Sequence, residues 1–227
     1  MRLELAERLR CPASQHAPTP LVVVAREVAA RDLRAGIAGC PVCSLEARIT
    51  AGDLWFGASA PSSAPAPAPA PADGATRAAT AAGPSAADVE RLVALLGLAD
   101  PGGAVLLTPA YAPFAPALES VAGVTVVLHE PATRRDAPGV AGVAAVRGLP
   151  DAVPFTDGTF RAAVLDADAG AYSGDAVRCL VPQGRVVGAA SLAVPPGVTV
   201  LARDAREWVG ERGALPGPIV PLGRRGR

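Results

Sequence analysis

Short apolar runs separated by amphipathic segments dominate the second half of the chain. Runs that suit buried strands lie at 104–108, 124–129, 143–147, 162–165, 185–190 and 198–202. A helix is expected to begin after Ser85, a suitable N-cap with Asp88 three residues later. Segments 111–120 and 175–180 are further predicted helices. This alternation of strands and helices predicts a doubly wound α/β domain.

The stretch from 149 to 188 is the most informative part of this pattern. Pro, Asp and Gly cluster at 154–158 and predict a turn, which leads into the apolar run at 162–165. A short helical segment and a second apolar run follow. Strand, helix and strand without a hairpin form a βαβ unit, so the two strands are expected to be parallel. Beyond this unit we predict a helix around 204–211 and a last strand near Ile219.

The N-terminal part carries a different signal, a set of thiols and one imidazole. A predicted short amphipathic helix at 3–9 is followed by Cys11-Pro-Ala-Ser14-Gln-His16 and, later, by Cys40-Pro-Val-Cys43. Two thiolates two residues apart on a tight turn are typical zinc ligands. Because Ser14 stands where a fourth cysteine would complete the set, His16 is predicted to be the fourth ligand. The predicted zinc site is therefore Cys11, His16, Cys40 and Cys43.

Two other uses of these cysteines are open from the residues alone. In one, the segment has lost its metal, the thiols are packed and His16 faces solvent. In the other, Cys40 and Cys43 act in redox chemistry, although the strand and long helix of a thioredoxin context are absent. A disulfide framework is not favoured in a chain expected to be cytoplasmic.

The composition changes sharply at residues 59–84, which consist mainly of Ala, Pro, Ser and Gly. The Ala-Pro repeat favours extended polyproline conformation, so this segment predicts a semi-rigid linker. It divides the chain into a zinc-ribbon-like module at 1–58 and an α/β domain at 85–227.

Charge and composition exclude several function classes. The formal net charge is zero, which argues against a strong nucleic-acid field, and the 21 basic residues are all arginine. Without lysine, Schiff-base chemistry is excluded. No apolar run approaches the roughly 20 residues of a membrane span, and the charged start has no signal-peptide core. We therefore expect a cytoplasmic protein with no membrane span.

Two sequence motifs follow one another in the α/β part, PF.DG.F...VLD at 154–166 and R.L.P.GR.VG at 178–188. Their order resembles the second half of class I S-adenosylmethionine (SAM) methyltransferases. The resemblance implies a doubly wound, Rossmann-like methyltransferase fold. The N-terminal pattern LRCP, CPVC and ARITAGDLWF is similar to the zinc ribbon of tRNA-methyltransferase activator proteins and of zinc-ribbon rRNA guanine methyltransferases, over about residues 1–57.

The chain departs from that family where SAM should bind. The family has an acid and a glycine-rich loop after its first strand, and here the acid position is Leu107. The glycine positions are Pro109, Tyr111 and Pro113. Leu149 stands where the family has an aspartate that reaches the adenine. The resemblance leaves Glu130 as the counterpart of the ribose-binding acid, a role it would have only if SAM binds.

Other candidate residues have ordinary structural interpretations. Asp166 and Asp168 could be paired carboxylates, but aspartates at a strand end more often cap a loop. Cys179 lies on an apolar helix face and is expected to be buried.

These observations favour a non-catalytic methyltransferase-like protein, a binding, structural or regulatory subunit that has lost SAM binding and works with a protein partner or larger complex. The alternative is an active SAM-dependent methyltransferase with a divergent cofactor site, acting on RNA or a small molecule. A third class is direct RNA binding through the ribbon and the arginines, including the basic tail at 223–227.

Overall fold

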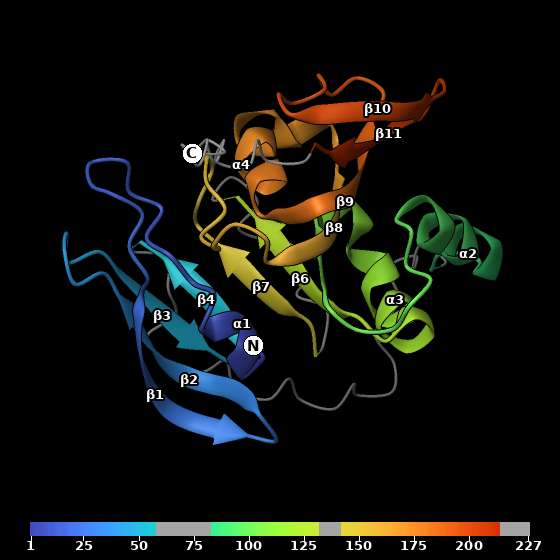
Figure 1. Cartoon of the computed structure of the whole chain (residues 1–227). Helices are drawn as coiled ribbons and strands as arrows, with labels where there is room; N and C mark the ends of the chain where they lie inside the picture. Colours follow the sequence, from blue (N-terminus) through green and yellow to red (C-terminus); the bar gives the residue numbers. More distant parts are fainter. Residues whose placement is uncertain (58–82, 132–141, 214–227) are drawn as a thin grey trace, which may run out of the picture.

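The computed structural model describes residues 1–57, 83–131 and 142–213, and these form one mixed sheet of 11 strands (Figure 1). The strand order is β1-β2-β3-β4-β7-β6-β5-β8-β9-β11-β10. The expected strand near Ile219 and the basic tail lie outside the described residues. So does nearly all of the predicted linker.

Five parallel strands form the centre of the sheet. They are β5 (Ala104–Leu107), β6 (Thr125–Glu130), β7 (Ala144–Arg147), β8 (Phe160–Leu165) and β9 (Leu180–Ala189). Numbered from β5 along the chain, their order across the sheet is 3-2-1-4-5, which is a doubly wound arrangement. The chain first adds β6 and β7 on one side of β5 and then adds β8 and β9 on its other side. The predicted α/β fold is confirmed.

Helices cover both faces of these strands. One face carries α2 (Ala86–Leu95) and α3 (Ala115–Ala122), and their apolar residues share a core with alternate residues of β5 and β6. The other face carries α4 (Ser173–Arg178) and, beside the N-terminal segment, α1 (Leu3–Ala6). The predicted N-cap of α2 is confirmed, since Ser85 and Asp88 form a reciprocal capping box.

The prediction of a helix around 204–211 is wrong. The structure has a hairpin there, with β10 (Val198–Arg203) antiparallel to β11 (Glu207–Arg212), and β11 also pairs with β9. The Asp204 carboxylate accepts hydrogen bonds from two following backbone amides and makes a turn where a helix was expected. Trp208 is fully buried, and its ring lies directly over Gly188, where a Cβ would be 2.2 Å from it.

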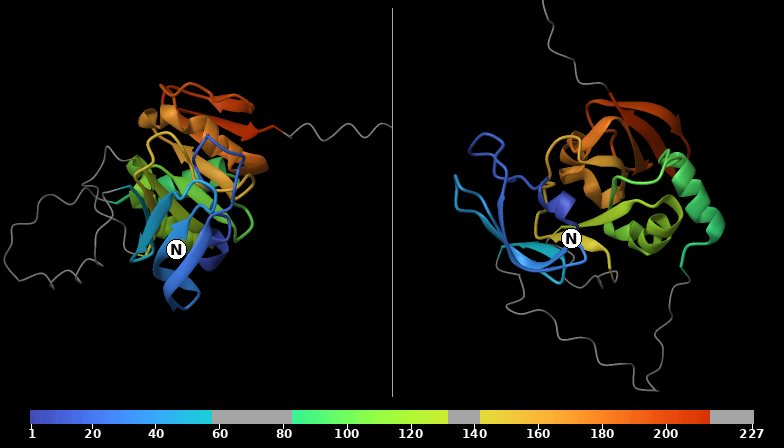
Figure 2. Two further views of the ribbon diagram at one scale, coloured as in Figure 1. Left: turned by 90° about the vertical axis from the view of Figure 1, so that its left-hand side faces the viewer. Right: turned by 60° about the horizontal axis from the view of Figure 1, so that its bottom comes forward.

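The N-terminal strands form an antiparallel meander of β1 (Val22–Ala29), β2 (Asp32–Gly39), β3 (Glu46–Thr50) and β4 (Asp53–Phe56). Strand β4 pairs in parallel with β7 and so joins the meander to the central sheet (Figure 2). Gly148 makes this approach possible, because a Cβ there would lie 2.4 Å from the Phe56 carbonyl oxygen.

A second connection runs through the turn at 154–158. The Arg10 amide donates to the Pro154 carbonyl at 3.0 Å, and the Thr156 amide donates to the Arg8 carbonyl at 2.8 Å. The Arg10 guanidinium also lies within ion-pair distance of Asp157 and Asp175. One apolar core contains residues from the N-terminal segment, the ribbon strands and the α/β strands alike. Loss of structure in the ribbon is therefore expected to expose apolar surface of the α/β part.

Candidate metal centre and cofactor crevice

The four predicted zinc ligands come together in the structure. Cys11 and His16 lie in the segment before β1, and Cys40 and Cys43 lie in the turn between β2 and β3. Their candidate ligand atoms all lie within 4.8 Å of one another. Cys11 and Cys40, one from each of these two segments, are buried. The cluster could hold a metal ion.

Two separations between candidate ligand atoms match those around zinc. A tetrahedral ion with Zn–S near ~2.3 Å and Zn–N near ~2.0 Å sets sulfurs about 3.8 Å apart and a sulfur and nitrogen about 3.5 Å apart. The Sγ atoms of Cys11 and Cys43 are 3.6 Å apart, and Cys40 Sγ is 3.5 Å from His16 Nε2. Three thiols and one imidazole fill all four positions of such an ion, which is the composition of a structural site.

The local backbone presents these groups to one point. The Cys40 amide donates to the Leu45 carbonyl, and the Ser44 amide donates to the Cys40 carbonyl, which closes a tight turn with Ser44 in the left-handed region. A hydrogen bond from the Leu45 amide lowers the pKa of the Cys43 thiol, whereas burial raises the pKa of Cys11 to about 11. A bound metal would displace the thiol protons. Ser14 is exposed and lies outside the cluster.

A crevice of about 470 Å³ lies at the carboxyl ends of the parallel strands. This is the edge of a doubly wound sheet where ligands bind, at the point where the strand order reverses. Its lining combines three prolines, two carboxylates, a small residue and a tyrosine, namely Pro109, Pro131, Pro150, Asp166, Asp168, Ala171 and Tyr172. None of these lining residues is basic.

The loop after β5 is a 3₁₀ helix, η1 (Pro109–Phe114), with a second proline, Pro113, inside it. Pro109 lines the crevice and has no amide to donate. Tyr111 packs toward Phe114, with ring centroids 5.9 Å apart, and burial raises its pKa. Leu107 is fully buried in the same core. The residue at the family's acid position therefore belongs to the apolar core, and the residues at its three glycine positions belong to the η1 helix.

The two aspartates after β8 have structural partners. Asp166 Oδ1 accepts a hydrogen bond from the Asp168 amide at the start of η2 (Ala167–Ala171), and the Asp166 amide donates to Thr108 Oγ1. Asp166 thus caps a turn and ties β8 to the end of β5. Leu149 is partly buried against the apolar core. The expected burial of Cys179 is confirmed, and burial raises its pKa to about 12.

Glu130 is in a buried charge network that the sequence analysis missed. Arg147, on the neighbouring strand, donates to the Glu130 carboxylate and, through Nε, to Asp53 Oδ2 at 3.1 Å. The guanidinium also lies 4.9 Å from the centre of the Trp55 ring. Burial raises the pKa of both Glu130 and Asp53. The network joins the ribbon to the α/β strands. The role of Glu130 toward a ribose stays a prediction.

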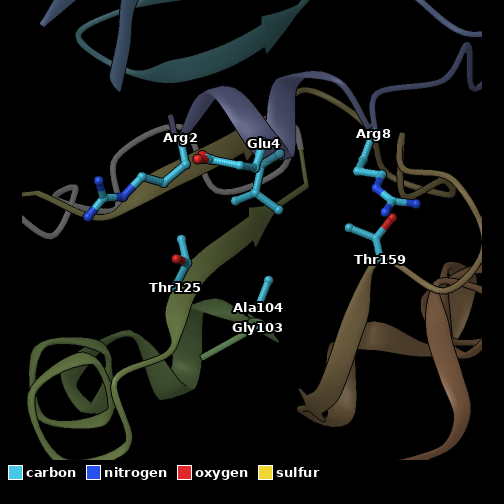
Figure 3. Close-up of a pocket in the computed structure, with 8 residues that line it drawn as sticks. Arg2, Glu4, Arg8, Gly103, Ala104, Thr125 and Thr159 are labelled. Atoms are coloured by element: carbon cyan, nitrogen blue, oxygen red, sulfur yellow. The ribbon is translucent and has the colours of Figure 1, made fainter. Parts of the chain in front are cut away.

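A second cleft, of about 400 Å³, lies at the opposite edge of the sheet (Figure 3). It runs between α1 and the amino ends of β5 and β6, and Arg2, Glu4 and Arg8 face Thr125 and Thr159 across it. Two of its charges have partners, since Arg2 lies 3.6 Å from Asp32 and Glu4 accepts from Arg31.

His129, on β6, predicts a pH dependence of stability. Burial lowers its pKa to about 4 against weaker opposing effects of the Leu149 backbone and Asp175, and its ring lies edge-on to Tyr172. As the pH falls below about 6.5, the unfolded chain takes up a proton that the folded chain does not, so stability is lost down to about pH 4. We expect the free energy of unfolding to fall by on the order of 3 kcal/mol over this window.

Urea unfolding of the wild type and of His129→Phe at several pH values between 7.5 and 4 measures this effect. The variant should lose less stability than the wild type by that amount. Equal losses in the two chains would show that His129 does not titrate as expected.

Solved structures that match part of this chain include methyltransferases, as the sequence resemblance predicted. One, assigned as a sarcosine dimethylglycine methyltransferase of Galdieria sulphuraria, is 17% identical over 44% of each chain, with a TM-score of 0.35. TrmN from Thermus thermophilus is 19% identical over 55% of this chain and 48% of its own, with a TM-score of 0.40. A chain from the complex between the Haloferax volcanii Trm112 methyltransferase activator and a methyltransferase is 13% identical, covering 56% and 88%, with a TM-score of 0.41.

The chain spans about half the length of the first three matching structures. All three TM-scores given above lie below 0.5, so the fold assignment rests on the strand order. No family model matches the chain, and no curated protein matches it in sequence. Among the described residues, no helix is long and apolar enough to cross a membrane.

Proposed function

We propose that this chain is a non-catalytic methyltransferase-like protein, stabilised by a structural zinc ion, that acts as a binding or regulatory subunit with a protein partner. The observation that carries the proposal is the η1 loop. A turn with prolines at two of the three glycine positions cannot bring backbone donors to the methionine part of SAM. The crevice lining has no basic side chain, so none of its residues could pair with the carboxylate of that methionine part.

The zinc part of the proposal rests on the geometry of Cys11, His16, Cys40 and Cys43. When bound, zinc would link the segment before β1 to the β2–β3 turn and so add folding energy. Its four protein ligands leave no position for water or substrate. None of the four cysteines, all of which are described, forms a disulfide, which fits the proposed cytoplasmic location.

One observation favours the second candidate, an active methyltransferase with a divergent site that acts on RNA or a small molecule. A crevice within the size range of small-molecule sites is present at the expected edge of the sheet. It would have to bind SAM without the glycine loop.

Methyl transfer separates the two candidates. The purified chain is incubated with methyl-labelled SAM and an extract of its native cells, and label is counted in RNA, protein and small molecules. We expect no incorporation above a heat-denatured control. Incorporation into any one fraction that depends on the folded chain would replace the proposal with the enzyme.

A further inference from the structure

The loop that carries His16 differs from the tight turn that carries Cys40 and Cys43. In that turn, backbone amides of neighbouring residues donate to backbone carbonyls and to the Cys43 thiol, so backbone hydrogen bonds hold both ligand-bearing residues in place. His16 lies five residues after Cys11, beyond the exposed Ser14. Its imidazole therefore needs another means of orientation if Nε2 is to face the thiols.

Hydrogen bonds assign the tautomer of His16. Its Nδ1 lies 2.7 Å from the Ala17 carbonyl oxygen, and because a carbonyl can only accept, Nδ1 must carry the proton. The neutral ring then has its lone pair on Nε2, the atom that lies 3.5 Å from Cys40 Sγ. This is the form that binds a metal.

Thr19 bonds to three groups near this imidazole. Its hydroxyl donates to the same Ala17 carbonyl at 2.8 Å, and its oxygen lies 3.3 Å from His16 Nδ1, where it can accept a share of that proton. Its own carbonyl accepts from the Cys11 amide at 2.8 Å. Pro18 and Pro20 flank Thr19 and restrict the backbone on both sides.

We infer that Thr19 is a positioning residue of the metal centre: its hydroxyl, together with the Ala17 carbonyl to which it donates, holds His16 in the Nδ1-protonated form and orients Nε2 toward the three thiols. The inference rests on the proposed zinc site. It assigns the hydroxyl a role that the Thr19 backbone cannot supply, since the bond to Cys11 uses only the carbonyl. A side chain of the same shape without the hydroxyl should therefore loosen His16 and leave Cys11 in place.

Zinc affinity measured by competition with a chromophoric chelator tests this role. We expect Thr19→Val to weaken zinc binding about 10- to 100-fold, the usual effect of losing a residue that orients a metal-bound histidine. Thr19→Ser keeps the hydroxyl and should retain the wild-type affinity. Thr159→Val, at a half-buried threonine outside the cluster, controls for general loss of stability.

Cobalt(II) spectra give a second readout that depends on the ligands. The spectrum of cobalt-loaded Thr19→Val should shift toward that of His16→Ala, while Thr19→Ser and Thr159→Val should match the wild type. Unchanged zinc affinity and an unchanged cobalt spectrum in Thr19→Val would overturn the inference and leave the metal site standing. A wild-type chain that binds no zinc would overturn both.

Discussion

We expect Cys40→Ala to abolish stoichiometric zinc binding and to destabilise the entire described core. Cys40 is buried, and its thiol lies next to His16 Nε2 in the four-ligand cluster. Structural zinc contributes about 10–16 kcal/mol of apparent binding free energy in small zinc-binding peptides, as much as the whole stability of many domains. Because the ribbon strands share one apolar core with the α/β strands, this loss should appear in a single unfolding transition.

Elemental analysis and thermal unfolding measure the two parts of this expectation. The wild type should contain one zinc ion per chain, and chelation should lower its Tm as far as Cys40→Ala does. Cys179→Ala is the matched control, because Cys179 is buried but lies outside the cluster. It should keep its zinc. A purified wild type that contains no zinc, and whose melting curve a chelator does not change, would contradict the metal site.

The second large effect is expected at Arg147. This residue is 8% exposed, and its guanidinium compensates the buried carboxylate of Glu130 and the half-buried carboxylate of Asp53. Arg147→Met removes the cation that both acids share, at a site where burial already raises the pKa of each. Breaking a buried ion pair in this way costs about 3–5 kcal/mol. Since Asp53 belongs to β4 and Glu130 to β6, the loss should loosen the ribbon from the central sheet.

Chemical denaturation of Arg147→Met, together with protease sensitivity of the ribbon, measures this change. Arg31→Met is the control, because Arg31 forms an exposed ion pair with Glu4 and its loss should leave the stability nearly unchanged. Triple replacement of Asp53, Glu130 and Arg147 by Asn, Gln and Met should recover part of the stability. Equal stability of Arg147→Met and wild type would show that the network does not hold the ribbon.

The parts of this molecule that could be predicted from sequence depend on local pattern. Apolar runs predict β5 to β10, and Ser85 with Asp88 predicts the start of α2, because each signal lies within a few residues. The Cys/His cluster was predictable because zinc ligands have recognisable types and spacing. Strand β11 was missed because Asp204, which reads as part of an acidic helix, instead caps a turn.

The joining of ribbon and α/β part could not be predicted from local pattern. Arg147 and Asp53 are 94 residues apart, and an arginine at a strand end is usually solvated. Gly148 gave the only local hint, since a glycine there allows the Phe56 backbone to approach closely. The pairing of Glu130 with Arg147 depends on the same joining of the two parts, so it could not be predicted from local pattern either. The division into a ribbon module at 1–58 and a domain at 85–227 stays a proposal.

Calorimetric titration of the full chain with SAM and with S-adenosylhomocysteine tests the central claim most directly. Relative to the family, Leu107 and Leu149 replace two carboxylates, and each lost hydrogen bond to a charged group costs roughly 1.5–3 kcal/mol. Two such losses weaken a micromolar site about a hundredfold or more. We therefore predict no binding of either compound at micromolar concentration. Micromolar binding that Glu130→Gln weakens would contradict the account and favour the active methyltransferase.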